Sequence, residues 1–86
     1  MTQLLRQVKQ DAKLGRVFPS RHALERMSER HVTAADVQRA IATATAATEQ
    51  SKEGTVLLEG GADSDGHPLR VVVRRIHQGL RLITVM

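Results

Sequence analysis

The chain contains no cysteine, tryptophan or tyrosine, and its only aromatic residue is Phe18. Without cysteine it can form neither disulfides nor thiolate metal sites, and such a composition suits a reducing compartment. No stretch approaches the roughly 20 apolar residues that a membrane-spanning helix needs. The N-terminal segment mixes charge into its apolar positions, unlike a signal peptide. We therefore expect a cytoplasmic protein without a membrane segment.

Acidic residues are missing from one end of the chain. Residues 1–65 contain nine Lys/Arg and nine Asp/Glu, whereas residues 66–86 contain four arginines and no acid. The whole formal charge of +4 therefore lies in the last segment. Such a field attracts polyanions, RNA above all. The alternative is a basic sheet edge that discourages aggregation. The four arginines are Arg70, Arg74, Arg75 and Arg81.

Hydrophobic periodicity predicts about three helices in the first half of the chain, over residues 2–14, 21–30 and 33–44. Ser20 is a suitable N-cap for the second helix. Thr33 and Asp36 have the spacing of a capping box at the start of the third.

The second half of the chain has the two-residue period of strands. A strand is expected over residues 54–59, a loop over 60–68, and then a hairpin that turns at Gln78-Gly79. Residues 45–50 either end the third helix or begin an edge strand. We therefore expect one α+β domain over residues 1–86, with N-terminal helices packed on a three- to four-stranded antiparallel sheet.

Alternation along the hairpin predicts that Arg70, Arg74 and Arg81 share one face with Val85, opposite a core face. Arg70 and Arg74 would lie about 13 Å apart, a spacing that suits phosphates two nucleotides apart. An arginine fork can bind a phosphate in two places. Alternatively, the arginine stems cover valines on a merely wet face, or the face docks an acidic protein.

Three polar residues share one side of the second helix. His22, Arg26 and Arg30 stand at i, i+4 and i+8, so a neutral imidazole could act as general base beside two phosphate-stabilising arginines. The alternative is a solvent-exposed side held by Arg21–Glu25 or Arg26–Glu29 pairs.

The other candidate catalytic groups are His67 and His77, which lie near the arginine strands and could donate a proton in a cleavage reaction. Metal-binding histidine spacings are absent, so we expect no metal and no cofactor.

Three runs carry a family resemblance: FPSRHALERMSERHVTAADVQRAI, LLEGGADSDGHPLRVVV and the closing LITVM. They resemble a family of small bacterial proteins of unknown function, with an H-x3-R-M-x2-R helix and a G-x-D-x-x-G-x-P/L-like loop. The opening of the chain is also similar to the MqsR toxins. Both groups are placed with the RelE-type toxins, which have helices packed on a twisted antiparallel sheet.

The resemblance implies a toxin of a type II toxin–antitoxin pair, a metal-independent endoribonuclease that cleaves free or ribosome-bound mRNA. Its partner would be a cognate antitoxin of the zinc-finger and helix-turn-helix type. The motif positions carried over are His22, Arg26 and Arg30, and more loosely Arg70 and Thr84. MqsR-type enzymes use a sheet tyrosine that this chain lacks, and we expect Phe18 to pack rather than to stack on a base. The same arginines could instead serve a non-catalytic nucleic-acid-binding module.

Overall fold

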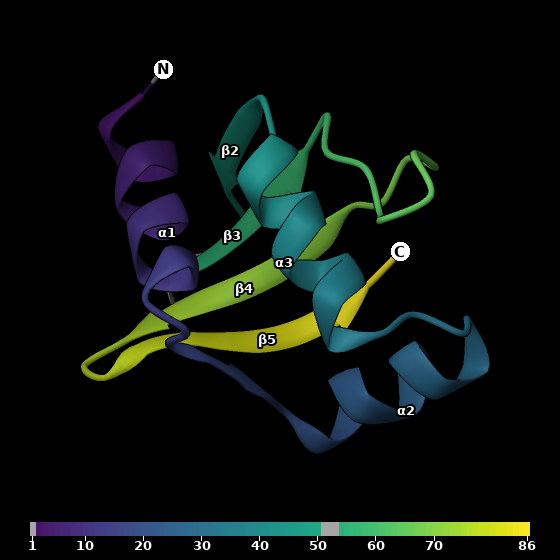
Figure 1. Ribbon diagram of the computed structural model, residues 1–86. Helices are drawn as coiled ribbons and strands as arrows, with labels where there is room; N and C mark the ends of the chain where they lie inside the picture. The colour runs from purple at the N-terminus through teal and green to yellow at the C-terminus, as the bar shows by residue number, and fades with distance from the viewer. Residues whose placement is uncertain (1, 51–53) are drawn as a thin grey trace.

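The computed structural model describes residues 2–50 and 54–86 and has an α+β fold, as expected (Figure 1). No helix in this part of the chain is long and apolar enough to cross a membrane. The elements in chain order are α1 (Gln3–Lys13), β1 (Val17–Pro19), α2 (Arg21–Glu29), α3 (Ala34–Thr43), β2 (Ala46–Glu49), β3 (Thr55–Glu59), β4 (Val71–Ile76) and β5 (Gly79–Val85).

The strands form one mixed sheet of five strands in the order β1-β5-β4-β3-β2. The expected antiparallel sheet of three to four strands is therefore wrong. Residues 17–19, which lie between the first two predicted helices and were expected in no strand, form an edge strand parallel to β5. The ambiguous segment 45–50 contains the other edge strand, β2, which is antiparallel to β3.

The turn of the β4–β5 hairpin differs from the predicted one. Ile76 pairs with Gly79, so the turn is His77-Gln78 and not Gln78-Gly79. Gly79 has a positive φ of 143°, and a Cβ there would collide with the backbone of Arg16 where the chain enters β1. The register shifts by two residues, and such a shift by itself keeps the side chains of a regular hairpin on their predicted faces.

A bulge in β5 changes the faces near the end of the chain. Val72 pairs with Thr84 and Val73 with Leu82, which leaves Ile83 as an extra residue. An extra residue reverses the alternation beyond it. Val85 is consequently fully buried in the core, and the prediction that it lies beside the arginines is wrong.

All three helices contribute to one hydrophobic core, and Figure 1 shows α1 and α3 side by side over the sheet. Core residues of β3, β4 and β5 alternate with side chains that point to the opposite side of the sheet. We call that opposite side the open face. The helical core residues are Leu5, Val8, Ala12, Ala23, Met27, Val37, Ala40 and Ile41, and the strand core residues are Val56, Leu58, Val71, Val73, Leu80, Leu82 and Val85.

The first turn of α2 is attached to β5. Ser20 caps the helix, since its Oγ accepts the Ala23 N–H at 3.0 Å. The same hydroxyl donates to the carbonyl of Ile83 at 3.3 Å, and the Ser20 N–H donates to the carbonyl of Leu82 at 2.9 Å. These bonds place the start of α2 beside the bulged end of β5.

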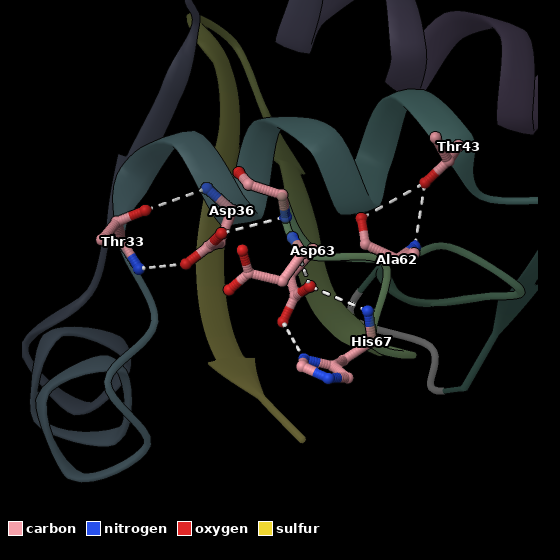
Figure 2. A network of polar contacts seen from close by, with 8 residues as sticks. Thr33, Asp36, Thr43, Ala62, Asp63 and His67 are labelled. Carbon is pink, nitrogen blue, oxygen red and sulfur yellow. Dashed lines mark hydrogen bonds and ion pairs between the residues drawn. The ribbon is translucent and has the colours of Figure 1, made fainter.

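The loop between β3 and β4 is fastened to α3 at two points (Figure 2). Asp36 completes the predicted capping box with Thr33, and its Oδ1 accepts the Ser64 N–H at 3.0 Å. At the other end of the helix, Thr43 Oγ1 accepts the Ala62 N–H at 2.9 Å. Gly61 lies so close to α3 that a Cβ there would collide with the carbonyl of Ala40. The loop is thereby held in one position.

Candidate nucleic-acid interface

A row of three side chains crosses the open face near the hairpin end of the sheet. Phe18 of β1 pairs with Arg81 of β5, which pairs with Arg74 of β4, so the three lie side by side on adjacent strands. Phe18 was expected to pack, and it is only partly covered, with 44% of its surface exposed. The row offers an aromatic surface next to two cations.

Arg70 lies at the other end of the open face, opposite an acid. Its backbone pairs with that of Met86, and its Nη1 lies 3.9 Å from Glu59 Oε2. The two side chains are about half exposed, at 52% and 44%. The segment without acids in the sequence is therefore not a surface without acids, because β3 brings Glu59 to the same face.

Apolar side chains separate these two ends. Val72 points to the open face and is not part of the hydrophobic core under the helices, yet it is only 8% exposed. Its neighbours on the open face must therefore bury it. Leu57 and Thr84 flank it across the sheet, and Arg70 and Arg74 flank it along β4. This placement fits the alternative interpretation in which arginine stems cover valines, while Arg70 and Arg81 remain exposed.

The helix motif has the contacts of a solvent-exposed helix side. Arg26 Nη1 lies 3.5 Å from Glu29 Oε2, and Arg21 Nε lies 3.6 Å from Glu25 Oε1, which are the two pairs that the alternative interpretation named. His22 is exposed. Met27 packs into the core, and Arg30 is the exposed C-cap residue of α2.

The other two candidate histidines, His67 and His77, lie at opposite ends of the sheet. His77 is exposed in the hairpin turn. His67 lies on the loop before Arg70, with its Nδ1 3.7 Å from Asp63 Oδ2. His22, His67 and His77 therefore belong to three separate segments, and within residues 2–50 and 54–86 no hydrogen bond or ion pair joins any of them to Arg70 or Arg81.

Asp63, Asp65 and His67 offer potential metal ligands within 4.8 Å of one another. Asp63 Oδ1 already accepts the backbone N–H groups of Asp65 and His67, both at 2.9 Å (Figure 2). These bonds give the carboxylate a role in folding the loop, and we assign no metal to it.

The pKa of one carboxyl group in the loop attachment is displaced. Hydrogen bonds from the backbone N–H groups of Thr33 and Ser64 lower the pKa of Asp36 from 3.8 to about 2. Asp36 therefore stays ionised at any pH near neutrality and holds the loop as an anion.

Two hollows lie on the helix side and contain none of the predicted site residues. One lies between α2, α3 and β1 and includes Met27 and Val37; the other lies between α1 and α3 and includes Lys9 and Lys13. The arginines occupy an open strand surface instead. Such a surface suits an extended polymer better than a small molecule, which needs a concave site.

The model of the domain of unknown function DUF4258 matches residues 20–86, from the N-cap of α2 to the end of β5. The chain belongs to the DUF4258 family. No curated protein and no solved structure matches the sequence. The expected membership of a family of unknown function is thus confirmed, and the kinship with MqsR and RelE toxins stays a prediction.

The DUF4258 match includes every predicted site residue and Glu59, whereas Phe18 lies just before it. The sequence did not predict that Phe18 and Glu59 lie on the open face beside the arginines. The Val-Phe-Pro run is too short to show a strand period, and Glu59 is separated from Arg70 by a long loop. Both residues reach the open face through pairing between segments that are distant in the sequence. The local sequence pattern does not indicate such pairing.

Proposed function

We propose that this DUF4258 chain binds single-stranded RNA on its open face and acts as the toxin of a toxin–antitoxin pair. The observation that carries the proposal is the row of Phe18, Arg81 and Arg74. Arginines bind backbone phosphates, and an exposed aromatic ring can stack on a base whatever its identity. A base can stack on Phe18 only when it is not stacked in a duplex, so the expected ligand is a single strand.

A second candidate function is metal-independent cleavage of the bound RNA. The hydrogen bonds of Ser20 to the carbonyls of Leu82 and Ile83 favour this cleavage function. They hold the first turn of α2, which carries His22, beside β5, which carries Arg81. His22 would take the proton of a ribose 2′-hydroxyl as its oxygen forms a bond to the adjacent phosphorus. The bond from phosphorus to the 5′-oxygen then breaks, and this oxygen takes a proton from His77 or water. Arg81 would hold the phosphate, and Arg26 and Arg30, which follow His22 on α2, would add positive charge.

The toxin assignment rests on the family resemblance of the sequence. It implies mRNA, free or on the ribosome, as the target, and a cognate antitoxin of the zinc-finger or helix-turn-helix type as the partner. The basic open face would suit an acidic segment of such a partner, which would then compete with RNA.

The test is the affinity of the purified protein for a fluorescent ten-nucleotide single strand and for the matching duplex. We expect tighter binding of the single strand, and Phe18→Ala should weaken it by about 1–3 kcal/mol. Leu14→Ala, which shortens another exposed apolar residue, is the matched control. Preference for the duplex, or equal loss in both variants, would contradict RNA binding by this row.

Cleavage is scored on the same RNA by gel electrophoresis with a metal chelator present. Wild-type protein should yield a 2′,3′-cyclic phosphate end, and His22→Ala should bind RNA equally well without cutting it. Binding without cleavage by the wild type would retain the binding function and remove the catalytic one. Co-purification of an acidic protein without any RNA affinity would support a protein-docking role instead.

A further inference from the structure

One residue of the open face, Glu59, is poorly suited to binding phosphate. Its carboxylate lies across from Arg70 and is as exposed as the arginine. A negative charge in this position repels a phosphate and weakens the attraction that Arg70 exerts on it. A surface that bound only the RNA backbone would be better without this acid, whereas an acid beside an arginine can together bind an RNA group that has both hydrogen-bond donors and an acceptor.

Both side chains have hydrogen-bonding capacity to spare. The distance of 3.9 Å between Arg70 Nη1 and Glu59 Oε2 exceeds that of a hydrogen bond. In the described part of the chain, this ion pair is the one polar interaction that either side chain makes. Two carboxylate acceptors and several guanidinium donors therefore stand next to each other at the surface.

We propose that Glu59 and Arg70 recognise a guanine base of the bound RNA, an inference that rests on the proposed function. The Watson–Crick edge of guanine presents two adjacent N–H donors, N1 and N2, beside the acceptor O6. A carboxylate accepts both N–H groups and an arginine donates to O6. Adenine, cytosine and uracil present a single donor group on that edge. They leave one carboxylate oxygen unpaired, which costs affinity.

The fold holds the two residues in place for this role. Leu58 pairs with Val71, and continuing this register places Glu59 opposite Arg70. The Leu69 N–H donates to the Gly61 carbonyl at 3.0 Å, which closes the base of the intervening loop. Arg70 is about 13 Å from Arg74 along the strand direction. A guanine at Arg70 and a base stacked on Phe18 would therefore belong to one short single strand.

The experiment compares three ten-nucleotide RNAs: all uridine, the same strand with one central guanine, and the same strand with one central adenine. Wild-type protein should bind the guanine strand about tenfold more tightly than the other two. Glu59→Gln should lose this preference and bind the all-uridine strand at least as tightly as before, because a repulsive charge is gone. Glu49→Gln removes an exposed acid from β2 and should behave like the wild type.

Each contrary result has a distinct meaning. Equal binding of the guanine and adenine strands by the wild type would overturn guanine recognition and leave RNA binding intact. A failure to bind any of the three strands would overturn both proposals. If Glu59→Gln weakens all three strands equally and lowers the melting temperature, the pair is structural and guanine recognition is wrong.

Discussion

At the scale of single residues, the extra residue in β5, Ile83, determines which side chains reach the core at the end of the chain. Strict alternation from Leu82 would place Val85 on the open face, and the bulge turns it inward, where it is fully buried. Ile83 remains partly exposed. Val85 is therefore expected to contribute more to the free energy of unfolding than Ile83, although the two aliphatic side chains are similar in size.

Val85→Ala should lower the free energy of unfolding by about 2 kcal/mol, because it removes two buried methyl groups and leaves a cavity. Ile83→Ala should cost less than about 1 kcal/mol, although it removes more atoms. Urea denaturation of the two variants measures both values. A larger cost at Ile83 than at Val85 would mean that β5 has no bulge at this position.

The faces of individual residues were predictable only as far as the strand was regular. Arg70, Arg74 and Arg81 were placed on one face correctly, because a register error of two residues preserves the faces. Val85 was misplaced because a bulge leaves no local mark in an apolar run. Phe18 and Glu59 were missed because their neighbours on the open face come from distant strands.

At the scale of elements, α3 serves as the anchor of the loop that precedes β4. Asp36 accepts the Thr33 N–H of its own capping box and the Ser64 N–H of the loop, at 2.9 and 3.0 Å. Both bonds favour the ionised carboxylate, which is why its pKa falls from 3.8 to about 2. A carboxyl group with a lowered pKa stabilises the fold above its unfolded-state pKa and loses this effect as the pH falls towards its folded-state pKa.

Asp36→Asn should therefore reduce the melting temperature at neutral pH. The deficit should shrink between pH 4 and pH 2, because the wild-type carboxylate becomes protonated in that window. Thermal melts of both proteins across this range, followed by circular dichroism, measure the difference. Asp11→Asn on α1 is the matched control, since the Asp11 side chain makes no such bond to any residue that the structure describes. A deficit that stays constant down to pH 2 would show that the charge of Asp36 is not what stabilises the loop.

The sequence predicted the elements with strong local patterns and missed those without them. The three helices and their caps at Ser20 and Thr33 were expected from periodicity and capping residues, and the structure has them. β1 has only three residues and owes its existence to β5, more than sixty positions later. A pairing at that separation is set by tertiary packing, which a local window does not contain.

At the scale of the whole molecule, the proposal depends on where the positive charge lies and not only on its sum. The net charge of +4 would attract RNA from any direction. The helices cover one side of the sheet, and the proposed RNA-binding row of Phe18, Arg81 and Arg74 lies on the other. Arg81 lies on the open face, and Arg39 is exposed on α3. Substituting each in turn therefore distinguishes RNA binding by the open face from attraction by the net charge.

Arg81→Gln and Arg39→Gln each change the net charge from +4 to +3, so they alter the overall field equally. Only Arg81→Gln removes a proposed phosphate contact. We expect it to weaken binding of single-stranded RNA and to lower the slope of log K against log salt by about one unit, while Arg39→Gln leaves the slope unchanged. Anisotropy titrations between low and physiological salt measure both slopes. Equal slopes for the two variants would mean that RNA affinity depends on the net charge of the whole molecule. The open face would then not be the binding site.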